Sequence, residues 1–264
     1  MAQEPQREPA ALGSMDAIMP PDMAKRAEST GTKKAEQDGL SLLALAGLAG
    51  AYVAFGATFA AAVTAGYGDT LPIGLGNMFG GLAFSLAYVL AIIGGAELFT
   101  TNVLMVMAYA HGRLPILRLL RAWGIVFVGN FIGAAVTGGL LILAGQYAEA
   151  GGAVGASLLK SAERIYSLAP FEALLLGVLG NTLLCLGVWL TYSARTTTDR
   201  ILALTPPVAA FYALGLEHAI AVMFYLPCAA FIGAIAEPGF WSTTGWAPLD
   251  IGVGGTLAVL LPVT

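Results

Sequence analysis

Charged side chains are scarce in this sequence: Asp, Glu, Lys and Arg make up only 11% of its 264 residues. In a soluble domain these four types make up about a quarter of the residues. Hydrophobic residues reach 58%, and the mean hydropathy is +0.79. The composition therefore excludes an ordinary soluble domain and indicates a protein that spans a membrane.

Other signals are missing as well. The 12 basic residues form no stripe, so nucleic acid is not an expected partner. The two cysteines, Cys185 and Cys228, both fall in apolar runs, which argues against a disulfide framework. There is no HExxH zinc motif and no GxSxG nucleophile motif, and we expect neither a metal nor a cofactor. The N-terminus lacks the apolar core and cleavage site of a signal peptide, so the first span is expected to stay in the membrane.

Long apolar runs predict the membrane spans. A bilayer core of about 30 Å needs roughly 20 apolar residues per helix. Five runs are long enough: Leu40–Ala65, Ile73–Glu97 with a continuation to Ala110, Trp123–Ala144, Phe171–Tyr192 and Ile201–Ala236. The second and fifth runs are too long for one plain helix, so we expect both to be interrupted.

Residues 1–39 differ from the rest and are predicted to form a cytoplasmic tail, with residues 40–264 as the transmembrane domain. Met15–Glu36 mixes apolar and basic positions, which fits either a helix on the membrane surface or a solvated tail. Ten basic residues fall in the tail and in the loops expected on the same side of the membrane as the N-terminus. Only Lys160 and Arg164 fall on the other side. This bias predicts a cytoplasmic N-terminus.

Two segments of the chain resemble each other. The second run contains "GGAELFTTNV" and the fifth contains "LGLEHAIAVM", each with a glycine shortly before a glutamate. Two over-long, interrupted spans at matching positions predict an inverted repeat with broken helices at mid-membrane. Glu97 and Glu217 are expected to stabilise these breaks by accepting hydrogen bonds from the amides of the following half-helices.

Polar residues inside the spans are candidates for a pore or for helix contacts. His218 is either a neutral imidazole satisfied by a neighbour or a pore residue. Its place just after a break favours the pore, with the Thr100 hydroxyl as its partner. Asn130 and Asn181 could each form hydrogen bonds between helices, and this is the role expected of Asn130. His111, at the cytoplasmic edge, is expected to be solvated.

Three motifs, "ELFTTN", "GNTLLCLGVWLTYSARTTTDRI" and "LGLEHAIAVMFYLP", resemble signature segments of the formate/nitrite transporter family, and "PPDMAKRAESTGTKKAEQ" resembles that family's N-terminal helix. The resemblance implies an all-α, aquaporin-like inverted repeat of six helices, with the second and fifth broken. It also implies a homopentamer in lipid, in the bacterial inner membrane, with one pore per subunit for a small monovalent anion or its weak acid. "GGTLAVLLPVT" is similar to the lead-in to the sixth helix, which would be cut short at Thr264.

The resemblance also implies roles for individual residues. His218 matches the central pore histidine, and Thr100 matches the threonine that faces it. The remaining matches are Leu98 and Phe99 in the loop of the second helix, Phe84 and Phe211 at the constrictions, and Asn181 near the pore. Two positions depart from the family: Tyr88 replaces a leucine, and Val222 replaces an asparagine. The family's vestibule lysine has only Lys160 and Arg164 nearby.

A transport mechanism follows from these expectations. An anion crosses a dry constriction at a cost of several kcal/mol, whereas a neutral acid crosses far more easily. We expect Phe84, Tyr88, Phe99 and Phe211 to form the dry part, with a cationic vestibule that attracts the anion. A channel and a proton-coupled transporter both fit this reading. The alternatives are a relative that has lost transport and serves a structural or sensory role, and a membrane-embedded enzyme that uses Glu217 and His218.

Overall fold

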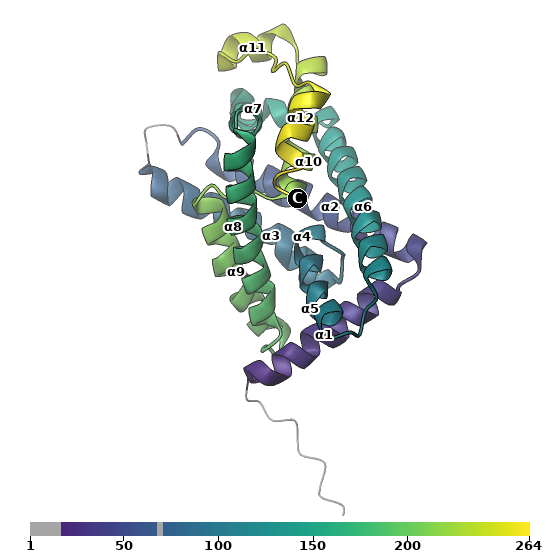
Figure 1. Cartoon of the computed structure of the whole chain (residues 1–264). Helices are drawn as coiled ribbons and strands as arrows, with labels where there is room; N and C mark the ends of the chain where they lie inside the picture. The colour runs from purple at the N-terminus through teal and green to yellow at the C-terminus, as the bar shows by residue number, and fades with distance from the viewer. Residues whose placement is uncertain (1–16, 68–70) are drawn as a thin grey trace, which may run out of the picture.

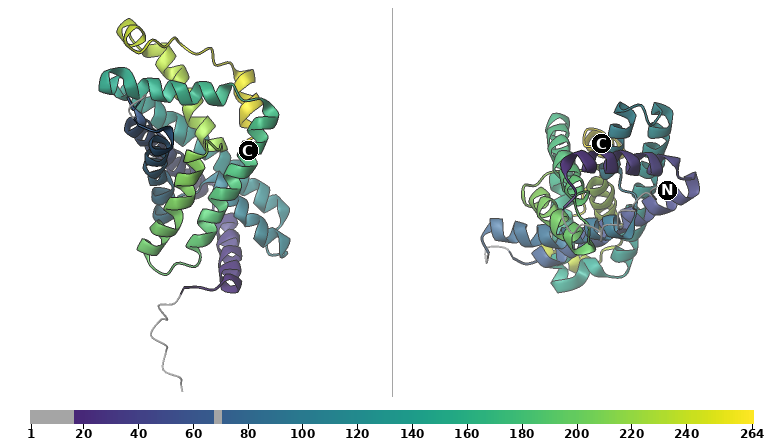
Figure 2. Two further views of the ribbon diagram at one scale, coloured as in Figure 1. Left: turned by 90° about the vertical axis from the view of Figure 1, so that its left-hand side faces the viewer. Right: turned by 90° about the horizontal axis from the view of Figure 1, so that it is seen from below.

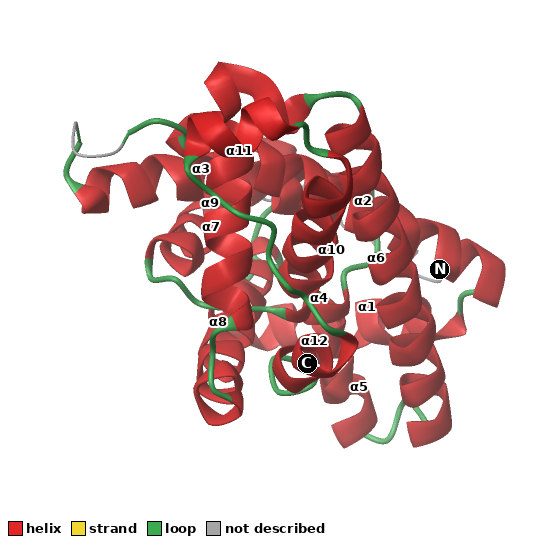
Figure 3. Cartoon of the chain, turned by 90° about the horizontal axis from the view of Figure 1, so that it is seen from above, coloured by secondary structure: helices red, strands yellow, loops and turns green. Residues whose placement is uncertain are grey.

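The computed structural model describes residues 17–67 and 71–264. Within these ranges the chain forms helices and loops and no strand (Figures 1 and 3). The elements are α1 (Pro20–Glu36), α2 (Gly39–Thr64), α3 (Ile73–Gly94), α4 (Phe99–Asn102), η2 (Val103–Met105), α5 (Val106–Ala110), α6 (Ile116–Leu143), η3 (Gln146–Gly152), α7 (Ala153–Tyr166), α8 (Pro170–Thr191), α9 (Thr197–Ala213), α10 (Ala219–Ile235), α11 (Pro238–Thr244) and α12 (Val253–Leu260).

Four of these helices, α2, α3, α6 and α8, are long and apolar enough to cross a membrane. A fifth crossing is possible if α10 and α11, bent by 118° at their junction, are counted together. The predicted interruptions are confirmed, because the second run is divided into α3 and α4–α5 and the fifth into α9 and α10. The protein is thus an all-α, multi-pass membrane protein.

One boundary differs from the sequence prediction. The third span was expected from Trp123, but α6 begins at Ile116. Extended backbone at Pro115 (φ −68°, ψ 144°) precedes the first turn, and the polar turns that follow carry Arg118 and Arg121. The hydropathy pattern marks only the apolar part of a helix, whereas the helix itself continues into the polar region.

Small residues allow the spans to approach closely. α2 packs along α6 and α3, and α3 packs along α9. A Cβ atom added at Gly133 would overlap the Gly47 carbonyl, and one added at Gly50 would overlap the Asn130 carbonyl. Close backbone approach of this kind is typical of packed membrane helices, where small residues line the interface.

The two ends of the bundle carry helices that lie across the spans. For Met15–Glu36 the sequence left open a surface helix or a solvated tail. In the structure α1 is helical and packs against α5, η2 and α6. It crosses one end of the molecule, and α7 and α11 lie at the other end (Figures 1 and 2). Asp38 accepts hydrogen bonds from the backbone of Leu40 and Ser41 and caps α2. Hydrogen bonds from the Ser41 side chain and its backbone N–H lower the pKa of Asp38.

Candidate functional site

The site is built around the two helix breaks. The first break runs from Gly95, the C-cap of α3, to Leu98; the second break runs from Leu214 to His218. Gly95 (φ 76°) and Gly215 (φ 65°) adopt the left-handed conformation that favours glycine at a helix C-terminus. This conformation explains why a glycine lies two residues before each glutamate.

The two breaks are attached to the neighbouring spans in the same way. The backbone N–H of Glu97 donates to the carbonyl of Leu45 in α2 (3.2 Å), and that of Glu217 donates to the carbonyl of Leu176 in α8 (3.4 Å). The first and fourth spans thus play equivalent parts in the two halves of the chain. This correspondence agrees with the predicted inverted repeat.

Asn130 of α6 holds the first break in place. Its Oδ1 accepts a hydrogen bond from the Phe99 backbone N–H, and its Nδ2 donates to the carbonyls of Ala46 and Glu97, each at 2.8 Å. The expected interhelical role of Asn130 is confirmed. A fully buried amide that satisfies three backbone groups fixes the position of this break.

The glutamate at each break forms an ion pair with a basic residue that lies outside the three sequence motifs. Lys34 Nζ of α1 lies 2.8 Å from Glu97 Oε2 and 2.8 Å from Asn102 Oδ1. Arg164 of α7 pairs through Nη2 with Glu217 Oε1 and donates through Nη1 to the Gly215 carbonyl (3.2 Å). Both glutamates are almost fully buried, so an unpaired carboxylate there would be costly.

These pairs correct two expectations. Within the described residues, the carboxylates of Glu97 and Glu217 bond to side-chain cations and not to the amides of the following half-helices. Arg164 is not a free vestibule charge, because its guanidinium is paired with Glu217. Lys160, the other residue expected there, is exposed on α7.

His218 lies in an aromatic cage at the second break. The ring centroids of Phe211, Phe84 and Tyr88 are 5.2, 6.1 and 6.2 Å from that of the imidazole. His218 is fully buried, and neither Nδ1 nor Nε2 has a hydrogen-bond partner among the described residues. A buried polar group left unpaired costs about 1–3 kcal/mol, so this arrangement is expected where a ligand supplies the missing partner.

Thr100 is not the partner of His218. Its hydroxyl lies 3.2 Å from the Tyr88 hydroxyl, a contact between the two half-helices of the second crossing. The expected Thr100–His218 hydrogen bond is therefore wrong. Tyr88, singled out as a departure from the family, holds Thr100 next to the cage.

The remaining predicted residues divide into two groups. Leu98 and Val222 are fully buried at the breaks, Val222 one turn after His218. Phe99 is not part of the cage, because its ring contacts Trp123 and Phe127. Asn181 lies apart from the cage, in an apolar groove on α8.

The amide of Asn181 donates to the carbonyls of Gly177 (3.0 Å) and Val263 (3.3 Å). No three His, Cys, Asp or Glu side chains gather as metal ligands in the described part of the chain.

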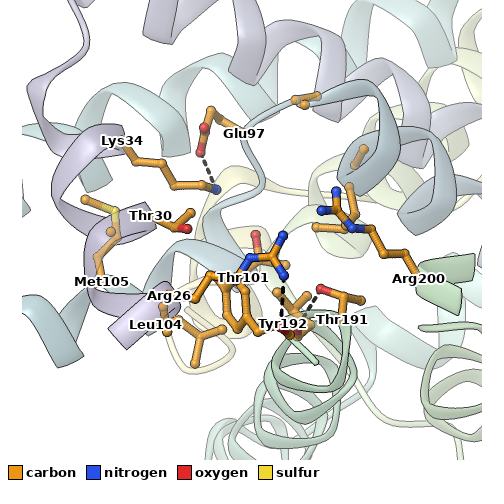
Figure 4. Close-up of a pocket in the computed structure, with 17 residues that line it drawn as sticks. Arg26, Thr30, Lys34, Glu97, Thr101, Leu104, Met105, Thr191, Tyr192 and Arg200 are labelled. Carbon is orange, nitrogen blue, oxygen red and sulfur yellow. Dashed lines mark hydrogen bonds and ion pairs between the residues drawn. The ribbon is translucent and has the colours of Figure 1, made fainter. Parts of the chain in front are cut away.

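A basic cavity lies on the α1 side of the first break (Figure 4). Its volume is about 270 Å³, and its cations are Arg26, Lys34 and Arg200. Arg26 Nη1 donates to the carbonyls of Tyr192 and Ala194 at 3.1 Å each, at the C-terminal end of α8. In the sequence these basic residues contributed only to the charge bias that predicts a cytoplasmic N-terminus, and nothing in the sequence indicated that they share a cavity.

Comparison with known proteins identifies this arrangement. Residues 21–264 match the family profile described as "Formate/nitrite transporter". The chain belongs to the formate/nitrite transporter family. The formate channel FocA of Escherichia coli (strain K12) is 39% identical over 233 residues, which cover 88% of this chain and 81% of FocA.

Two solved structures resemble this formate/nitrite transporter. One, described as "Pentameric formate channel with formate bound", superimposes with a TM-score of 0.80 at 35% identity, covering 85% of this chain and 89% of its own. Another, an "FNT family ion channel", has a TM-score of 0.76 at 21% identity over 92% of this chain and 91% of its own, and it supports the fold alone. The resemblance seen in the sequence motifs is confirmed.

Proposed function

We propose that this chain forms a membrane pore for small monovalent anions or their conjugate acids, with formate as the first substrate to test. The observation that carries the proposal concerns the two ring nitrogens of His218, which have no partner among residues 17–67 and 71–264 and are enclosed by three aromatic rings. A neutral imidazole offers one N–H donor and one acceptor nitrogen, which match a carboxylic acid or a carboxylate.

The aromatic cage would act as the dry part of the pathway. A bare anion is poorly stabilised between Phe84, Phe211 and Tyr88, because none of these rings carries a charge. A hydrogen bond or a proton shared from His218 would lower the charge on the substrate during this step. The hydroxyl pair of Tyr88 and Thr100 is a second polar contact at the same level.

The ion pairs leave little free charge near the two breaks. Glu97 and Glu217 are each neutralised by one cation, so neither repels an approaching anion. Arg26 and Arg200 line the cavity beside α1 and would attract an anion toward the pore. The anion would thus be attracted at the cavity beside α1 and would lose its water at the aromatic cage around His218.

We further propose a homopentamer in the bacterial inner membrane, with the N-terminus and α1 in the cytoplasm. The excess of ten basic residues over two supports this orientation. The large exposed apolar side chains of the spans, such as Leu117, Leu140 and Phe171, require lipid or a neighbouring subunit. A similar solved channel is described as pentameric.

Uptake of formate into proteoliposomes tests the function. His218→Ala and His218→Leu should assemble normally yet lower flux roughly ten- to hundredfold, the loss expected for one hydrogen bond to a charged group. Ser242→Ala, an exposed change on α11, is the matched control. Normal uptake in both His218 variants between about pH 5 and 8 would exclude the pore role. The absence of uptake by the unmodified protein would instead favour a relative that has lost transport.

A further inference from the structure

The cavity beside α1 carries more positive charge than a passing monovalent anion needs. Three cations, Arg26, Lys34 and Arg200, line it together with one carboxylate, Glu97. Lys34 is already paired with Glu97, so the two guanidinium groups remain uncompensated. In Figure 4 both guanidinium groups and the Lys34 ammonium point toward the middle of the cavity.

Arg200 is the least explained of the three. Its side chain is half-buried in the first turn of α9, and no hydrogen bond or ion pair satisfies its guanidinium among the described residues. Arg26, by contrast, is anchored by the carbonyls of Tyr192 and Ala194 through Nη1, which leaves its Nη2 and Nε without a partner in the described part of the chain. The planar guanidinium groups of Arg26 and Arg200, both with unused N–H donors, therefore face the same cavity.

The volume also exceeds the need of a small monovalent anion. At about 270 Å³, the cavity has room for several water molecules or for a phosphate group. Thr30 and Tyr192, which also line the cavity, carry hydroxyl groups that can donate further hydrogen bonds. Guanidinium forks match the oxygens of phosphate in pairs. A phosphate dianion would balance the two uncompensated charges.

We propose that this cavity binds a phosphate group, supplied by inorganic phosphate or by a small phosphate monoester, as a ligand that is not transported. A dianion is excluded from the aromatic cage around His218 more strongly than a monoanion, because the cost of desolvation rises with charge. The ligand therefore stays in the cavity, at the entrance to the pore. Bound there, it inhibits anion flux from the α1 side, a consequence that rests on the proposed function, whereas the binding does not.

Calorimetric titration of the purified full chain in detergent tests the binding. The two probes are inorganic phosphate and glycerol 3-phosphate, with sodium chloride at the same ionic strength as the reference. Binding of either probe above the chloride reference supports the proposal and identifies its source, and binding of neither overturns it. Arg200→Gln should weaken binding roughly tenfold or more, the loss expected for a charge-assisted contact.

Arg118→Gln, an exposed change on α6 with no described partner, is the matched control and should bind as the unmodified chain does. Arg200→Lys keeps the charge and loses the fork, so it should bind between the two. Size-exclusion chromatography shows whether each variant assembles. Binding that is equally strong in Arg200→Gln and Arg118→Gln would overturn the assignment to this cavity.

Formate uptake with and without phosphate inside the vesicles tests the inhibition. Flux should fall with phosphate in the unmodified protein, and the ratio of the two fluxes should approach one in Arg200→Gln. Phosphate that binds without changing a measurable flux would overturn the inhibitory role. If no formate uptake occurs without phosphate, the proposed function fails, and calorimetry still decides whether the site exists.

Discussion

Replacing Asn130 with alanine should release the first helix break while leaving the spans in place. The change removes one acceptor from the Phe99 N–H and two donors from the carbonyls of Ala46 and Glu97. Hydrogen bonds in membrane bundles average about 0.6 kcal/mol each, and buried ones in other proteins average about 1 kcal/mol or somewhat more. Three lost bonds therefore cost about 2–4 kcal/mol.

Hydrogen–deuterium exchange followed by mass spectrometry measures this local loss. If the break opens by itself, a cost of about 2–4 kcal/mol raises the exchange rate of the segment from Glu97 to Asn102 roughly 30- to 700-fold. Asn181→Ala is the matched control, because its amide bonds to its own helix and to one carbonyl near the C-terminus. Exchange in this segment that is unchanged in Asn130→Ala would refute the view that Asn130 fixes the break.

Three further changes test other contacts. Gly133→Val should force α2 and α6 apart and lower the thermal midpoint in detergent by several degrees, since overpacking costs about 1–3 kcal/mol; a midpoint equal to that of the unmodified chain would contradict the close packing. Tyr88→Leu should raise lactate flux relative to formate flux in proteoliposomes, and an unchanged ratio would show that this ring does not limit the width. His111 Nδ1 lies 2.7 Å from Oε1 of the buried Glu28, an ion pair only when the imidazole is protonated. His111→Ala should speed exchange in α1 by an amount equivalent to about 1 kcal/mol or less, because the imidazole is exposed; an unchanged exchange rate would argue against the contact.

The helix breaks could be predicted from the sequence because their signals are local. A glycine that must adopt positive φ lies just before each glutamate. Each of the two apolar runs that contain these glutamates is also longer than one membrane-spanning helix. The hydrogen bonds that Asn130 forms between helices could also be predicted, because a lone amide in an apolar span needs partners. His218 was a candidate because it is an ionisable residue just after a break, and the resemblance to the family added Phe84 and Phe211.

The counter-charges could not be predicted in the same way. Lys34 is 63 residues from Glu97, and Arg164 is 53 residues from Glu217, and no periodicity connects them. His111 is exposed, as expected, but its contact with Glu28 could not be predicted, because it depends on the packing of α1 against α5. The hydroxyl pair of Tyr88 and Thr100 likewise depends on how the chain turns at the break.

The order of the two ion pairs along the chain has a consequence for synthesis at the membrane. In both halves the basic residue precedes its acid, by 63 residues in one case and 53 in the other. At about 5–20 residues per second, each cation leaves the ribosome roughly 3–13 seconds before its glutamate. A carboxylate entering the bilayer thus finds its counter-ion already made, on a helix that lies outside the spans. The nascent chain can neutralise each buried acid as it arrives, without waiting for a later segment or for a second subunit.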